Sequence, residues 1–170
     1  MKKILLTGAT GYIGKRLLPV LVQNGFDVTC VVRDSARFHV PAGTESKVRV
    51  IEADFLNEET LSVIPVDIDA AYFLIHSMSV STDDFDTLEA QAAENFRKRI
   101  SQTQAKQVIY LSGIFNEEKL SRHLTSRKRV EEILAKGDYA LTTLRAGIIV
   151  GSGSASFEII RDLVEKLPVM

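Results

Sequence analysis

Short apolar runs alternate along this chain with longer segments in which apolar residues recur at helical spacing. The strands predicted from these apolar-rich segments are residues 4–6, 28–32, 48–51, 70–75, 108–111 and 141–150. Short continuous runs of this kind are typical of parallel strands that are buried on both faces. The run at 70–75, Ala-Ala-Tyr-Phe-Leu-Ile, predicts a central strand of such a sheet.

Most segments between these strands predict helices, whereas the one between residues 32 and 48, rich in Ser, Pro and Gly, predicts a loop. The first helix begins after Gly14, carries leucine and valine side chains on one side and ends at Asn24-Gly25, a common C-terminal stop. Pro19 lies inside it and removes one backbone hydrogen bond, so we expect a local kink there. Further helices are predicted for residues 57–64, 84–103, 122–136 and 156–166.

Strands and helices alternate throughout the chain. Because a connection between parallel strands is right-handed, this order predicts one parallel sheet with helices on both faces. The predicted fold class is α/β, a doubly wound parallel sheet of the Rossmann type. The chain stops after Leu167-Pro168-Val169-Met170, where a further strand would be expected. We therefore expect it to be the N-terminal part of a longer protein, whose remainder supplies much of a substrate pocket.

Three glycines follow the first strand directly and lie where the first helix begins. Gly8 permits a tight turn, Gly11 lets the backbone approach a pyrophosphate, and Gly14 lets helix and strand pack closely. The helix then directs its free N–H groups and the positive end of its dipole at the phosphates. The pattern predicts a dinucleotide-binding domain over residues 1–170. A purely structural use of the three glycines is the weaker alternative.

The composition narrows the class of protein. Of the 170 residues, 45% are hydrophobic and 25% are charged, and the formal net charge is −1. This indicates one soluble domain with a substantial core, and it gives no electrostatic reason to expect nucleic acid or an anionic membrane as partner. The single cysteine, Cys30, cannot form an internal disulfide, so a reducing cytoplasm is the expected location. No apolar stretch is long enough to span a bilayer.

Several segments match one family in the correct order. The most specific is Thr7-Gly8-Ala9-Thr10-Gly11-Tyr12-Ile13-Gly14. The others are Val31-Val32-Arg33-Asp34, Ala53-Asp54-Phe55, Tyr110-Leu111-Ser112-Gly113 and Leu144-Arg145-Ala146-Gly147-Ile148-Ile149-Val150-Gly151. Over essentially its whole length the chain resembles an atypical, extended-type short-chain dehydrogenase/reductase, close to the NmrA-like and nucleoside-diphosphate-sugar epimerase-like groups. The resemblance implies a nicotinamide dinucleotide lying across the carboxyl ends of the strands.

The resemblance places cofactor-binding residues in the glycine motif and at the ends of the second, third and fourth strands. They are Gly8, Thr10, Gly11, Tyr12, Ile13, Gly14, Arg33, Asp54, Phe55, Ile75 and His76. Asp54 matches a carboxylate near the adenine amino group, and a plain turn role is its alternative. Ile75 and His76 end the strand that passes the nicotinamide ribose, and a loop histidine is the alternative for His76.

Arg33 bears on the choice of cofactor. In dinucleotide folds that bind NAD, an acidic residue about twenty positions after the glycine motif contacts the ribose hydroxyls. This chain has Arg33 at that strand end. A guanidinium group pairs with a 2′-phosphate and stacks on adenine, which favours NADP over NAD, although NAD stays possible. The alternative is an exposed arginine paired with Asp34 or Glu52.

The catalytic position departs from the family pattern. Most members carry a Tyr-x-x-x-Lys pair on the fifth helix, and here His123 and Arg127 occupy those two positions. Their four-residue spacing places both on one helix face. Histidine can exchange a proton near neutral pH, whereas arginine can hold a ribose but hardly ever loses its proton. Ser112 resembles the family's serine. A solvated helix face is the alternative, and no metal-ligand cluster is visible.

Two classes of function remain from the sequence. The first is an NADP-dependent oxidoreductase or epimerase-like enzyme acting on an unknown small molecule. The second is a catalytically inactive sensor or assembly factor that uses NAD(P) occupancy to control a partner protein. Loss of the Tyr-x-x-x-Lys pair favours the sensor, whereas His76 and His123 favour the enzyme.

Overall fold

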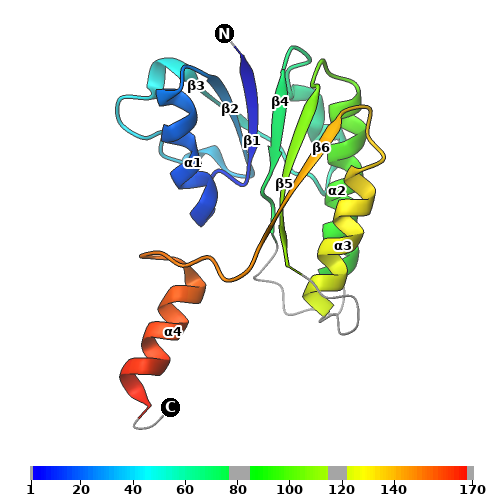
Figure 1. The fold of residues 1–170 in the computed structure, drawn as a ribbon. Coiled ribbons are helices and arrows are strands. Elements are labelled where there is room, and N and C mark those ends of the chain that lie inside the picture. Colours follow the sequence, from blue (N-terminus) through cyan, green and yellow to red (C-terminus); the bar gives the residue numbers. More distant parts are fainter. Residues whose placement is uncertain (1, 77–84, 115–121, 168–170) are drawn as a thin grey trace.

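A computed structural model describes residues 2–76, 85–114 and 122–167, and in these residues six strands form one sheet (Figure 1). The strands are β1 (Lys3–Thr7), β2 (Asp27–Val32), β3 (Val48–Glu52), β4 (Ala70–Phe73), β5 (Gln107–Gly113) and β6 (Ala140–Ala146). The α-helices are α1 (Tyr12–Gln23), α2 (Phe85–Ser101), α3 (Arg122–Leu134) and α4 (Ala155–Lys166). Three short 3-10 helices are η1 (Ser35–Arg37), η2 (Glu45–Lys47) and η3 (Glu58–Val63).

The strand order is β3-β2-β1-β4-β5-β6, and every neighbouring pair is parallel. The predicted doubly wound parallel sheet is therefore confirmed. The order reverses between β1 and β4, and in open α/β sheets this reversal creates the crevice in which ligands bind. The Thr7 hydroxyl joins the two strand ends, because it donates to the Tyr72 carbonyl at 2.9 Å and accepts from the Leu74 amide at 3.1 Å.

Two hydrophobic layers cover the two faces of the sheet (Figure 1). Successive strand residues point to opposite faces. Leu6 accordingly packs in the layer of α1, whereas Leu5 packs in the layer of α2 and α3. The second layer contains a group of packed aromatic rings, in which Phe73 lies 4.7 Å from Phe96 and 6.0 Å from Tyr110 between ring centroids. This rigid core fixes the strand ends that form the site.

Three elements differ most from the sequence-based prediction, two in where they end and one in its helix type. β4 ends at Phe73 rather than at residue 75, because β1 turns away at Gly8 and the Leu74 amide bonds to a side chain instead. β6 ends at Ala146 rather than at residue 150. The predicted helix at 57–64 is the 3-10 helix η3, in which amides bond three residues back, as from Thr60 to the Asn57 carbonyl. α1 runs through Pro19 as one helix.

The last helix, α4, extends away from the sheet beyond the carboxyl ends of the strands (Figure 1). Its large apolar side chains are exposed, together with that of the residue after it: Ile159, Ile160, Leu163, Val164 and Leu167. In the described part of the chain, α4 therefore presents an uncovered apolar face.

Candidate dinucleotide site

The glycine turn between β1 and α1 has no room for side chains at two of its three glycines. Gly8 has φ +67°, and a β-carbon there would lie 2.5 Å from the Leu74 carbonyl oxygen. A β-carbon on Gly14 would lie 2.2 Å from the Gly8 carbonyl oxygen. These two positions hold the turn against β4 and hold α1 against the turn.

Gly11 differs from the other two glycines because it faces open space. Its backbone is exposed, and a β-carbon there would meet only the Gly8 carbonyl oxygen, at 3.2 Å. Gly11 is the N-cap of α1, where no side chain caps the helix and no acidic residue occupies the first turn. Free N–H groups and the positive dipole end are therefore available to an anion, so these residues fit a dinucleotide pyrophosphate. Thr10 is exposed here, and Ile13 is half-buried.

A contact that the sequence did not indicate joins the first turn of α1 to the segment between β6 and α4. The Arg16 guanidinium stacks on the Tyr12 ring, 3.8 Å from its centroid, and donates a 2.6 Å hydrogen bond to the Ser152 carbonyl oxygen. A β-carbon on Gly151 would lie 2.2 Å from the Tyr12 hydroxyl oxygen, so a side chain there would displace the Tyr12 ring. Tyr12, Arg16 and residues 151–152 therefore form one wall beside the glycine turn.

Arg33 follows β2 directly, and its side chain is exposed. The two acids that the sequence offered as its partners are engaged elsewhere. Asp34 pairs with Arg37 at 3.0 Å and caps η1, and Glu52 accepts hydrogen bonds from the Ser35 amide and hydroxyl at 3.1 and 2.9 Å. Both hydrogen bonds lower the pKa of the Glu52 carboxyl, and the bond from the Ser35 amide contributes more than the bond from its hydroxyl. Among the described residues, Arg33 has no ion-pair partner.

Asp54 and Phe55 follow β3 in a tight turn. The Asp54 carboxylate accepts a 3.0 Å hydrogen bond from the Leu56 amide, so it has a turn role. The Phe55 side chain is buried in the core, where its ring lies 5.7 Å from that of Phe96, and the Asn95 amide donates to its carbonyl at 2.8 Å. The buried Phe55 ring therefore anchors the turn to the core.

Beyond β4, Ile75 packs against the core and His76 meets a buried carboxylate. Nδ1 of His76 lies 3.8 Å from Oε1 of Glu89, which comes from α2. The other oxygen of Glu89 accepts a 2.6 Å hydrogen bond from the Ser126 hydroxyl on α3. Both Glu89 and Ser126 were missed from the sequence. Glu89 could have been found, because it lies at helical spacing on the apolar stripe that includes Ala92, Ala93 and Phe96.

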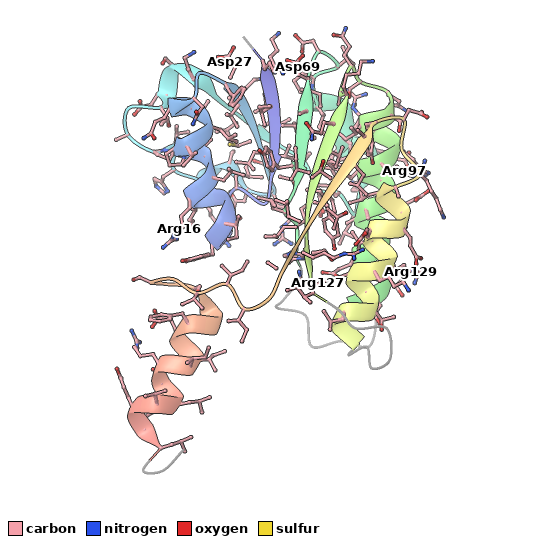
Figure 2. All side chains as sticks on the ribbon, in the orientation of Figure 1. Arg16, Asp27, Asp69, Arg97, Arg127 and Arg129 are labelled. Carbon is pink, nitrogen blue, oxygen red and sulfur yellow. The ribbon has the colours of Figure 1, made fainter. Side chains whose placement is uncertain are left out.

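Ser112 lies near the carboxyl end of β5, and Arg127 on α3 lies against Gly113 at the same strand end. Ser112 is buried, and among the described residues its hydroxyl has no hydrogen-bond partner of ordinary geometry. A β-carbon on Gly113 would lie 3.6 Å from Cδ of Arg127, which places that side chain against the strand end. Figure 2 shows Arg127 on the sheet side of α3, whereas Arg129 lies on the outside. The fully solvated helix face considered from the sequence therefore does not apply to Arg127.

Tyr110 lies beneath this strand end. Burial raises the pKa of its hydroxyl above the usual range, and the nearby Arg127 guanidinium opposes that shift. The hydroxyl donates a long hydrogen bond to the Arg127 carbonyl, at 3.4 Å. Tyr110 is therefore a neutral core residue that supports α3. The His123 side chain, predicted as catalytic, lies outside the described part, although its backbone belongs to the first turn of α3.

The described part of the chain has neither a metal-ligand cluster nor a membrane-spanning helix. It contains no group of three or more His, Cys, Asp or Glu side chains that could hold a metal ion. It also contains no helix with the length and apolar character needed to cross a membrane.

Similar solved structures share the fold. A nucleoside-diphosphate-sugar epimerase from Staphylococcus aureus is 22% identical with a TM-score of 0.70, over 85% of this chain and 50% of that one. The triphenylmethane reductase of Citrobacter sp. is 20% identical with a TM-score of 0.70, over 84% and 48%. The enzyme WbmH of Bordetella bronchiseptica, solved in complex with NAD+, is 18% identical with a TM-score of 0.73, over 97% and 63%.

At these identities the likenesses show the fold alone, and the chain spans about half the length of the first two proteins. The family comparison is more specific, because residues 8–161 match the family described as NAD(P)H-binding. That match includes the three glycines, Arg33, His76 and Arg127. Its cofactor is thus a nicotinamide dinucleotide, and the chain belongs to the NAD(P)H-binding family, with the Rossmann fold of short-chain dehydrogenases/reductases and sugar epimerases.

Proposed function

We propose that this chain is the cofactor-binding part of an NADP-dependent oxidoreductase or epimerase-like enzyme that acts on a small molecule. The observation that supports NADP is the state of Arg33. Its guanidinium is exposed at the end of β2, while Asp34 and Glu52 are engaged with Arg37 and Ser35. An unpaired guanidinium at this position suits a 2′-phosphate, which it can bind through two parallel hydrogen bonds.

The other proposed cofactor contacts come from residues around the crevice between β1 and β4. The open backbone at Gly11 and the first amides of α1 hold the pyrophosphate, with Thr10, Tyr12 and Ile13 around it. The carboxylate oxygen of Asp54 that is not used by the turn is available to the adenine amino group. Ile75 and His76 border the nicotinamide ribose at the end of β4.

Residues at the ends of β4 and β5 would hold the reacting end of the cofactor. A bound NADPH supplies a hydride from its nicotinamide ring. Arg127, held against the end of β5, binds the nicotinamide ribose through its guanidinium, and the Ser112 hydroxyl orients the substrate oxygen. A histidine exchanges the proton with that oxygen, and the two candidates are His123, by its position on α3, and His76. Either histidine suits this role because an imidazole can gain or lose a proton near neutral pH.

The experiment that tests this function uses the full-length protein with NADPH, NADH and a panel of carbonyl compounds. We expect tighter binding of NADPH than of NADH in calorimetric titrations, together with substrate-dependent NADPH oxidation. A preference for NADH would overturn the cofactor assignment.

The exposed apolar face of α4 favours a second candidate, a sensor that binds NAD(P) and a partner protein. Arg16 and Tyr12 connect the glycine turn to the segment that leads into α4, so a bound cofactor could affect that helix. Cofactor binding without turnover of any carbonyl compound would favour this candidate. A reducing cytoplasm suits either function, since Cys30 is a free cysteine.

A further inference from the structure

Glu89 is a carboxylate buried where an apolar residue would be expected. Only 8% of its side chain is exposed, and its neighbours on the same stripe of α2, Ala92, Ala93 and Phe96, belong to the core. Burying a carboxylate costs several kcal/mol unless its partners compensate, and replacing a buried ion pair by apolar residues is often neutral or stabilising. Stability alone therefore does not account for Glu89, which points to a role in the site.

Glu89 on α2 contacts residues from two other parts of the fold, α3 and the segment after β4. Ser126 on α3 donates to Oε2 at 2.6 Å and fixes the carboxylate plane, and Oε1 faces Nδ1 of His76 after β4 at 3.8 Å. A cavity of about 10 Å³ is lined by His76 and Glu89 together with core residues, which is room for about one water molecule. An ionised carboxylate only accepts hydrogen bonds, so a direct contact between Oε1 and Nδ1 favours the proton on Nδ1.

The second ring nitrogen of His76 is left without a partner. Nε2 is buried, and among the described residues no group bonds to it. Buried polar atoms nearly always have a partner, and an exception calls for an explanation such as a catalytic role. His76 is two residues beyond Leu74, whose carbonyl packs on Gly8, so it lies next to the crevice at the β1–β4 reversal.

We propose that Glu89 is a positioning residue that fixes the tautomer of His76, so that Nε2 is the nitrogen that exchanges a proton with the substrate. The tautomer stands on its own, whereas the exchange rests on the proposed oxidoreductase function. In carbonyl reduction, the carbonyl carbon receives the hydride that NADPH supplies and the C=O π bond opens. The oxygen takes the proton from Nε2–H of the imidazolium, and His76 is left neutral with Nδ1–H facing Glu89. Oxidation of an alcohol reverses each step.

The direct test measures the tautomer by two-bond ¹⁵N–¹H NMR on the full-length protein labelled at histidine, at a pH where the ring is neutral. A His76→Asn variant assigns the signals. We expect the Nδ1–H tautomer in the wild type and its loss in Glu89→Met, which keeps the side-chain length without the carboxylate. The matched control is Glu94→Gln on the same helix, which removes a more exposed carboxylate bound to Arg97 and should leave His76 unchanged. An Nε2–H tautomer in the wild type would overturn the proposal without any variant.

Kinetics test the proton exchange separately. Glu89→Met should lower kcat about tenfold or more while NADPH affinity changes less than about twofold, and adding it to His76→Asn should cause little further loss because the two residues act as a unit. Independent, multiplying losses would overturn the coupling. If no carbonyl compound is turned over at all, the enzymatic function fails, but the tautomer measurement still decides the role of Glu89.

Discussion

The Arg16 guanidinium donates a hydrogen bond to the Ser152 carbonyl oxygen at 2.6 Å, across 136 residues of sequence. It ties the start of α1 to the segment that leads from β6 into α4. Because the same guanidinium stacks on Tyr12, one side chain joins the glycine turn, which we propose binds phosphate, to the segment before α4.

Removing this tie should loosen the segment without unfolding the domain. Arg16 is exposed, and an exposed charged contact or cation–π pair contributes about 0.5–1 kcal/mol. Arg16→Ala should therefore raise hydrogen exchange in residues 149–154 several-fold and leave the core strands protected. Hydrogen-exchange mass spectrometry measures this, with Lys15→Ala as the matched control. Equal exchange in both variants would show that the segment is held by other contacts.

Two glycine substitutions should separate folding from cofactor binding. In Gly14→Ala the new β-carbon would collide with the Gly8 carbonyl at 2.2 Å, so the free energy of unfolding should fall by at least about 2 kcal/mol. In Gly11→Ala the nearest atom is 3.2 Å away, so stability should change by less than about 1 kcal/mol. The dinucleotide affinity of Gly11→Ala should nevertheless collapse, because the methyl group enters the space proposed for the pyrophosphate. Denaturant unfolding measures the stability of the two variants, and calorimetric titration measures dinucleotide affinity. An unchanged affinity in Gly11→Ala would show that the turn serves packing and does not bind the cofactor.

Glu52 should titrate below its ordinary pKa of 4.5 because the Ser35 amide and hydroxyl both donate to it. Its folded-state pKa is lowered, so its contribution to stability is present above the unfolded pKa and is lost as the pH falls through the folded pKa. In Ser35→Ala the hydrogen bond from the backbone amide to Glu52 remains, so the pKa of Glu52 should rise only part of the way to 4.5. Carboxyl ¹³C NMR titration measures this, and a full return to 4.5 would assign the whole shift to the hydroxyl.

Arg127 and Arg129 provide a matched pair on one helix. Arg127 lies against the end of β5, whereas Arg129 is exposed on the outside of α3 (Figure 2). Arg127→Ala should therefore weaken NADPH binding through the loss of a ribose contact, by about 1 kcal/mol or more, and Arg129→Ala should not. Equal affinities in the two variants would remove Arg127 from the cofactor site.

The sequence predicted those features that depend on local pattern. Continuous apolar runs gave all six strands, and the glycine spacing indicated the turn whose backbone leaves space at Gly11. It failed where an element's end depends on a distant partner. β6 stops at Ala146 although the apolar run continues, and the segment after it meets Tyr12 and Arg16 instead of a neighbouring strand.

The buried acid–base group was missed for a related reason. Glu89 appears polar in the sequence, and only the convergence of α2, α3 and the end of β4 shows that it is enclosed. Its position on the apolar stripe of α2 was the available signal. The state of Arg33 likewise depended on hydrogen bonds between Ser35 and Glu52 that sequence spacing does not determine.

The central claim, NADP recognition by Arg33, is tested most directly by titrating NADPH and NADH into Arg33→Ala and into Arg37→Ala. Arg37 is another exposed arginine nearby, but it is already paired with Asp34. Arg33→Ala should weaken NADPH by roughly 1.5–3 kcal/mol, about 10- to 150-fold, because a charge-assisted hydrogen bond to the 2′-phosphate is lost. NADH affinity, and both affinities in Arg37→Ala, should change less than about threefold. An equal loss for NADPH and NADH in Arg33→Ala would contradict the account, because the arginine would then bind only the part that both cofactors share.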